Sequence, residues 1–162
     1  MAELTHVKGL DGFLETLKVL PPEIVSKSGG PVRTALRKAA VVFQKEAISN
    51  VQLIVDQPNK DGSTPENSKT LERAIVVSRK KPRGFKGEVF QVRVKRGAKA
   101  PNGITANKYG GVLEFGYEGV AAKPWLRPAF ESNKQAALDT FVSEMRRRTE
   151  AAAKKARKMG QR

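Results

Sequence analysis

A single long amphipathic stretch, from Val32 to about Val55, constrains the fold of this chain more than any other feature. Its apolar residues recur at steps of three and four, which is the spacing of one face of an α-helix. Basic residues mostly occupy the other side. The apolar stripe comprises Val32, Leu36, Ala39, Phe43, Ala47, Val51 and Ile54. We therefore expect a long helix that packs through this stripe against other elements.

Two further helices are indicated, one before and one after this stretch. In residues 9–20, apolar residues recur at helical spacing, and Pro21-Pro22 ends the pattern. Pro124 is expected to open a last helix, and Trp125 lies near its start. From Arg146 onward its apolar stripe fades into alanines and basic residues, so this end predicts an exposed helix that frays when free. The two stripes are Leu10, Phe13, Leu14 and Leu17 in the first helix, and Leu126, Phe130, Ala137, Phe141 and Met145 in the last.

The middle of the chain predicts a β-hairpin. Leu71–Arg79 contains the β-branched run Ile75-Val76-Val77, which is typical of a strand. Glu88–Lys95 alternates, with Phe90, Val92 and Val94 on one face and polar residues on the other. The two segments can pair antiparallel around a basic turn. Tyr109–Gly116 is apolar apart from one acid, and its pattern fits either a strand or a short helix.

These elements predict an α+β fold. We expect a single domain over residues 1–162, in which a long N-terminal helix and a C-terminal helix pack on a small antiparallel β-sheet. Turn-forming residues predict flexible loops near residues 57–69 and 96–108. A basic C-terminal extension covers residues 146–162.

A net charge of +15, from 31 basic and 16 acidic residues, indicates a polyanionic or acidic partner. Solubility and a solvated basic tail explain the same charge, and both interpretations stay open. A basic β-ribbon can lie along phosphates and release counterions. Few aromatic side chains accompany the hairpin, so the contact would be independent of sequence. The expected contact residues are Lys80, Lys81, Arg83, Lys86, Arg93, Lys95 and Arg96 around the hairpin, and Arg146, Arg147, Arg148, Lys154 and Lys155 near the C-terminus.

The sequence offers little for catalysis. It contains no cysteine, so thiolate chemistry is excluded. A Ser-His-Asp triad or a histidine metal site would depend on the single histidine, His6, which is expected to be a solvated surface residue. No phosphate-binding glycine loop is present. Glu114 lies between two apolar residues and is expected to pair with Arg127 rather than to act as a catalytic acid. We expect no enzymatic activity and no cofactor. We also expect no signal peptide and no membrane-spanning segment.

Three stretches together resemble a family of phage proteins. They are Gly9-Leu10-Asp11 with its helical stripe, Tyr109–Gly116 with Glu114-Phe115-Gly116, and Lys123–Phe130. This combination is similar to the tail-completion or head–tail joining family of long-tailed bacteriophages, the gene-product-ten-like family of the Hong Kong 97 type. That family has a V-E-[FY]-G-like turn, followed by a P-x-[LM]-x-P-A-[FL] segment that opens the C-terminal helix.

The resemblance implies a structural virion protein at the head–tail junction, made and assembled in the cytoplasm of the bacterial host. It implies a ring of copies, six in number, that completes or terminates the tail. Its partners would be the tail tube or tail terminator protein, the head-closure proteins and the DNA in the channel. Interface contacts are then expected from Tyr109, Glu114, Phe115, Trp125, Leu126, Arg127 and Phe130, although in a monomer Trp125, Leu126 and Phe130 would be core. The alternative function is sequence-independent nucleic-acid binding through the basic hairpin and tail.

Overall fold

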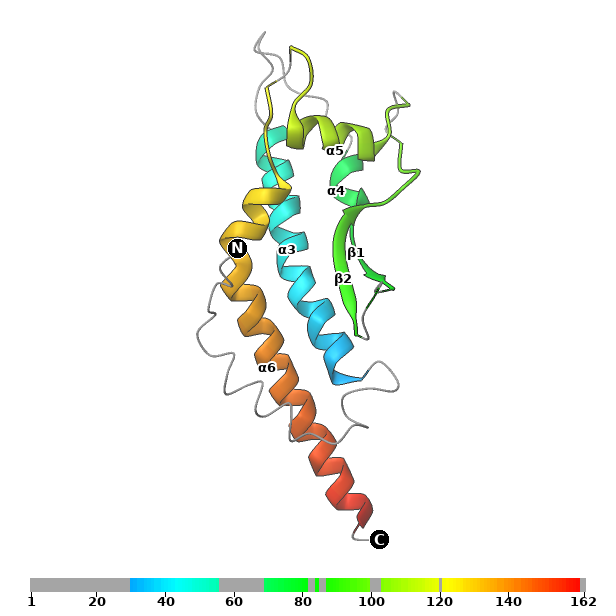
Figure 1. Cartoon of the computed structure of the whole chain (residues 1–162), viewed down its shortest axis with the longest axis vertical. Helices are drawn as coiled ribbons and strands as arrows, with labels where there is room; N and C mark the ends of the chain where they lie inside the picture. The colour runs from blue at the N-terminus through cyan, green and yellow to red at the C-terminus, as the bar shows by residue number, and fades with distance from the viewer. Residues whose placement is uncertain are drawn as a thin grey trace.

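Two long helices are the largest elements of the computed structural model. The structure describes residues 30–55, 69–81, 84, 87–99, 103–119 and 121–160. The helices α3 (Pro31–Val55) and α6 (Leu126–Gly160) pack along each other (Figure 1). They run antiparallel, because Lys38 near the start of α3 bonds Glu144, whereas Asn50 near its end bonds the carbonyl of Trp125. Three buried alanines of α3, Ala35, Ala40 and Ala47, let neighbouring elements approach closely. The long helix predicted from Val32 to about Val55 is confirmed.

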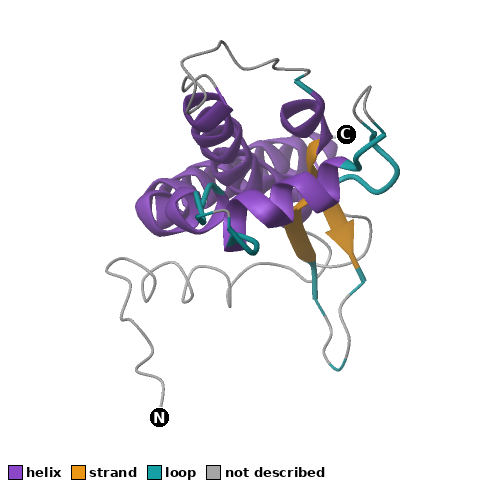
Figure 2. Ribbon diagram, turned by 90° about the horizontal axis from the view of Figure 1, so that it is seen from above, coloured by secondary structure: helices purple, strands orange, loops and turns teal. Residues whose placement is uncertain are grey.

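A two-stranded antiparallel sheet lies against α3, to one side of the helices (Figure 2). Strand β1 (Ile75–Lys80) pairs with β2 (Val89–Val94), so that Ile75 is opposite Val94 and Lys80 is opposite Val89. Val92 and Val94 pack on the core, whereas Gln91 and Arg93 bond the hydroxyl of Ser78 on the other face. The predicted hairpin and its alternation are confirmed, as is the α+β class.

The prediction of a strand over Leu71–Arg79 is wrong for its first four residues. Residues Thr70–Ala74 form a short helix, α4, and the strand begins only at Ile75. Leu71 and Ala74 are three residues apart, so a helical turn buries both side chains on one face. This burial in the tertiary core outweighs the local strand pattern.

Residues Ala106–Phe115 form helix α5. The segment Tyr109–Gly116, whose pattern fitted either a strand or a short helix, is therefore helical up to Phe115. Helix α5 also shortens the loop expected over residues 96–108, because the helix includes the last three of them. Within the described part of that loop, Lys99 and Thr105 form an isolated antiparallel bridge. The main core gathers between α3, α4, β1, α5 and the start of α6, around Val51, Ile75 and Trp125.

Helix α6 begins at Leu126, two residues after the proline expected to open it, and continues far past the start of α3 (Figure 1). The helix extends through Gly160. The basic extension is thus helical as far as that residue, as the sequence predicts. A smaller cluster joins Met145 to Ala35 of α3. None of the described helices is both long and apolar enough to cross a bilayer. The helix expected over residues 9–20 and all but the last residue of the loop expected over 57–69 lie outside the described residues.

Candidate assembly interface

Helix α5 presents one face to the core and the other to solvent. Thr105 caps its first turn, because the side-chain oxygen accepts a hydrogen bond from the backbone N–H of Lys108 at 3.3 Å. Gly116 follows the last turn with a φ of 77°, a conformation that glycine adopts without steric cost. The buried face carries Ala106, Gly110 and Glu114, which are spaced four residues apart.

Gly110 makes room for the single tryptophan of the chain. A Cβ at this position would lie 3.0 Å from Cδ1 of Leu71 and 3.4 Å from Cζ2 of Trp125. The indole Nε1 donates a hydrogen bond to the carbonyl of Gly110 at 2.9 Å, so the buried tryptophan has its polar atom satisfied. The absence of a side chain at Gly110 thus fixes how closely α5 approaches the start of α6.

The carboxylate of Glu114 holds the start of α6 through hydrogen bonds, and we call this arrangement the Glu114 clamp. Its Oε2 accepts hydrogen bonds from the backbone N–H groups of Trp125 and Leu126, each at 2.8 Å. Its Oε1 accepts from the backbone N–H of Arg127 at 3.2 Å and from the Nε of the same residue at 3.0 Å. Helix N-termini have free N–H groups and a positive dipole end, so they favour a carboxylate. The predicted ion pair of Glu114 with Arg127 is confirmed.

Burial and hydrogen bonding act on the pKa of Glu114 in opposite directions. Burial acts to raise the pKa of the carboxyl, because it disfavours the charged form. The hydrogen bonds from Leu126, Trp125 and Arg127 favour the charged form and together outweigh burial, so the pKa lies below its ordinary value. Glu114 is therefore ionised at neutral pH and acts as a structural acceptor.

Exposed aromatic side chains lie on α5 and just after its end. Phe115 and Tyr117 are 73% and 70% exposed, and Tyr109 is 39% exposed. The guanidinium of Arg127 lies over the ring of Phe115, 5.5 Å from its centroid, in a cation–π contact. Partial burial raises the pKa of the Tyr109 hydroxyl, so this side chain stays neutral at physiological pH. We call Tyr109, Phe115, Tyr117 and Arg127 the aromatic surface.

The residues that the sequence suggested for an interface divide into two groups. Trp125 and Glu114 are buried, and Leu126 is half-buried, so these three position the start of α6. The exposed group consists of Tyr109, Phe115, Arg127 and Phe130. The expectation that Trp125 belongs to the core of a monomer is met, whereas Phe130 is 51% exposed and packs its ring on Phe43 at 5.0 Å between centroids.

The basic residues suggested for polyanion contact are likewise distributed over two regions. At the hairpin, Lys80, Lys81, Lys95 and Arg96 are exposed, whereas Arg93 is half-buried and bonds Ser78. Arg83 and Lys86 lie outside the described residues, as does the side chain of Lys155. On α6, Arg146, Arg147 and Lys154 are exposed and Arg148 is half-buried.

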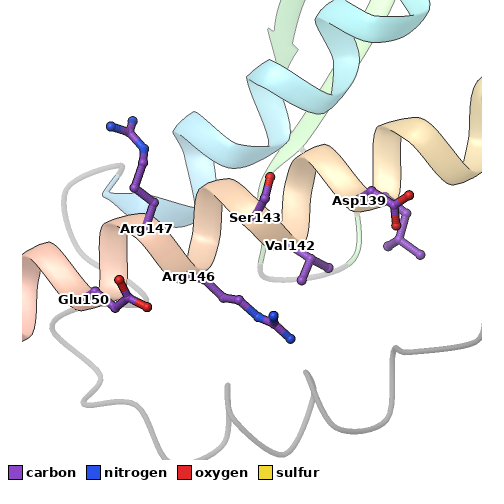
Figure 3. Close-up of a pocket in the computed structure, with 7 residues that line it drawn as sticks. Asp139, Val142, Ser143, Arg146, Arg147 and Glu150 are labelled. Carbon is purple, nitrogen blue, oxygen red and sulfur yellow. The ribbon is translucent and has the colours of Figure 1, made fainter.

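Part of the positive charge on α6 is already paired. The buried carboxylate of Glu144 bonds Arg147 at 2.8 Å, Lys38 at 2.8 Å and Arg148 at 2.7 Å. These three partners hold the pKa of Glu144 far below its ordinary value. Arg146 lies outside this network, and its side chain points away from that of Arg147 (Figure 3). Among the residues that the structure describes, Arg146 has no carboxylate partner, whereas Arg147 and Arg148 both pair with Glu144.

Sequence reasoning missed two parts of this arrangement. Tyr117 was not among the expected interface residues, although an aromatic residue in a glycine-flanked connector is a recognisable signal of exposure. The Glu144 network also had a signal, because the acid precedes Arg147 and Arg148 by three and four residues. Its third partner, Lys38, is distant in sequence and had none. No three acidic or histidine side chains gather into a possible metal site among the described residues.

Comparison with protein families identifies a match over most of the described chain before α6. A model of the family described as "Bacteriophage HK97-gp10, putative tail-component" matches residues 11–116. This range includes the hairpin, α5 and the aromatic residues up to Phe115. No curated protein and no solved structure matches the chain.

Proposed function

The chain belongs to the HK97-gp10-like family of bacteriophage tail components, and from this membership we propose that it is a structural protein of the virion at the head–tail junction. In this proposal, copies of the chain assemble into a closed ring, six-fold in symmetry. The ring completes or terminates the tail and links the tail tube or tail terminator protein to the head-closure proteins. The proposal gives the protein no catalytic role.

The aromatic surface is the observation that carries this proposal. Aromatic side chains and arginine are enriched at protein interfaces and supply most of the binding energy there. Here the exposed ring of Phe115 lies under the guanidinium of Arg127, and Tyr117, two residues beyond Phe115, is also exposed. Arg127 is fixed by its bond to Glu114 and by its contact with Phe115, so little conformational entropy of this pair remains to be lost on binding.

The distribution of charge supports a second contact at the other end of the molecule. Helix α5 lies at one end of the long axis, and the basic end of α6 lies at the other (Figure 1). A ring subunit contacts its neighbouring copies through limited patches, and its remaining surface stays available to other partners. In the proposed ring, the aromatic surface contacts the neighbouring copy, and the exposed cations Arg146 and Lys154 face acidic proteins or the DNA in the channel.

Disruption of the gene in the phage tests this function. Negative-stain microscopy of the lysate is expected to show filled heads and finished tails that remain separate. Plasmid-borne wild-type protein should restore joined virions. Normal joined particles in the absence of the protein would exclude a role at the junction.

Variants of the aromatic surface test the interface within the same assay. Because both side chains are largely exposed, Phe115→Ser with Tyr117→Ser should leave the fold intact. We expect the double variant to give far fewer plaques than wild type in complementation, because truncating an interface anchor typically costs about 1 kcal/mol or more of association. The matched control is Phe115→Tyr with Tyr117→Phe, which keeps both rings. Equal plaque numbers from the serine variant would refute the assignment of this surface.

Nucleic-acid binding is a second candidate function, which the net charge of +15 and the exposed hairpin lysines favour. It predicts binding of duplex DNA of any sequence, with an affinity that falls steeply as salt rises. Replacing Lys80 and Lys81 by glutamine should then weaken binding and reduce the salt slope by about 2, one unit for each lost phosphate contact. Binding that disappears near 150 mM salt, a level of the order of physiological ionic strength, would remove this candidate.

A further inference from the structure

An open apolar groove of about 490 Å³ crosses the face that α3, β2 and α6 share. Its base includes the small side chains Ala39 and Ala40 of α3, beside Phe43. One wall is Phe90 to Val92 of β2, and the other is the first turn and a half of α6 with Phe130. Half of the Phe130 surface is exposed, so apolar area remains uncovered in this groove. Such area is costly to leave in water and favours an apolar occupant.

An amphipathic helix binds a groove of this kind through apolar anchors at positions i, i+3, i+4 and i+7. The same chain contains this spacing in Leu10, Phe13, Leu14 and Leu17, which lie outside the described residues. The family match begins at residue 11, so it extends through this segment as well as through α3 to α5. We propose that these four side chains occupy the groove of their own chain.

The length of the connecting chain allows this docking. Residues 18–30 separate the last anchor from the start of α3 and can span up to about 40 Å when extended. Ala39 lies eight residues into α3, which is about 12 Å along its axis. The connector is therefore longer than the path it must cover. A short connector also gives the segment a millimolar effective concentration at its own groove, which favours it over the segment of another copy.

A pair of introduced cysteines tests the docking directly, because the natural chain has no cysteine. Leu14→Cys with Ala39→Cys is expected to form a disulfide within one chain when the dilute full-length protein is oxidised with diamide. A non-reducing gel would show a faster monomer band. The matched control is Thr16→Cys with Ala39→Cys, since residue 16 lies on the opposite side of a helix from residue 14. The control should oxidise at least about tenfold more slowly, a ratio equivalent to about 1.4 kcal/mol.

Three results would overturn the proposal. Equal rates for the test and control pairs would show that the anchors have no fixed position. A covalent dimer as the main product would show that the segment binds another copy. Failure of the test pair to oxidise at all would show that the segment does not reach the groove.

Thermal unfolding provides a second measurement that does not depend on disulfide geometry. Phe13→Asp with Leu17→Asp removes two anchors and should lower the Tm by about 6 °C or more, from the usual value of buried apolar side chains. Thr16→Asp adds a charge on the side of the helix opposite Leu14 and should change the Tm by less than about 2 °C, as surface substitutions do. Similar melting of the two variants would contradict the docking. Both measurements use purified protein, so their outcome is independent of the role at the head–tail junction.

Discussion

Replacing Glu114 by alanine removes the acceptor that holds α5 to the start of α6. Four donors lose their partner, namely the backbone N–H groups of Trp125, Leu126 and Arg127 and the Nε of Arg127. Arg127 can turn to water because its side chain is 66% exposed. The Trp125 N–H cannot do so easily, because Trp125 is buried. The cost therefore falls mainly on the backbone of the helix start.

The magnitude follows from two contributions. Loss of a helix cap costs about 1 kcal/mol, and a buried donor left without a partner costs about 1–3 kcal/mol. Together they predict a destabilisation of about 2–4 kcal/mol. For a chain of 162 residues, this corresponds to a Tm lower by about 4–16 °C. Glu114→Gln keeps one acceptor oxygen but loses the charge, so we expect a smaller effect of about 1–2 kcal/mol.

Circular dichroism melting at a series of pH values measures this effect. The folded pKa of Glu114 is lowered, so its stabilising contribution is fully present above the unfolded pKa and is lost as the pH falls through the folded pKa. The difference in Tm between wild type and Glu114→Gln should therefore be largest near pH 7. It should shrink as the pH falls below about 4, the unfolded range of a glutamate.

Arg127→Ala provides the matched control for the clamp. It removes the exposed half of the ion pair but leaves every backbone donor with its acceptor, so we expect a loss of at most about 1 kcal/mol. A Glu114→Ala protein that melts within about 1 °C of wild type, or no more than the Arg127→Ala protein, would refute the reasoning.

Three further predictions concern single positions. Gly110→Ala should destabilise the protein by about 1 kcal/mol in urea unfolding, because overpacking against Leu71 outweighs the gain in helix propensity, whereas Gly111→Ala has open space and should stabilise it by up to about 1 kcal/mol. The opposite order would contradict the packing of α5. Glu144→Gln should lower the Tm at pH 7 and converge with wild type in acid, because the lowered pKa of Glu144 makes its contribution disappear as the pH falls; a constant difference at all pH values would exclude the charge as its cause. Thr105→Ala should cost about 1 kcal/mol through loss of the α5 cap, and Thr105→Ser, which keeps the hydroxyl, should cost less when both are compared by thermal melting.

The periodic elements of this fold could be predicted from the sequence. The stripe of α3 is long enough for its three- and four-residue steps to exclude a strand, and the alternation of β2 excludes a helix. Shorter segments could not be assigned in this way. Thr70–Ala74 is helical because Leu71 and Ala74 reach the core from the same turn, which is a tertiary effect that a local pattern does not contain.

In the candidate site, too, the features set by local sequence could be predicted and those set by tertiary packing could not. Glu114 could be recognised as a buried acid between apolar neighbours, and its partner Arg127 was predicted correctly. The three backbone donors that dominate its environment could not be predicted, because they depend on where α6 begins relative to α5. The bond from Asn50 to the Trp125 carbonyl joins residues 75 apart and left no signal in the sequence.

Locating the protein in the virion tests its proposed role most directly. An epitope tag at the C-terminus, beyond the described residues, would be labelled with gold-conjugated antibody on purified phage particles. We expect gold at the junction of head and tail, in particles that also remain infectious. Labelling along the tail, at its distal tip or on the head, or virions without any label despite expression of the tagged protein, would contradict a structural role at this junction.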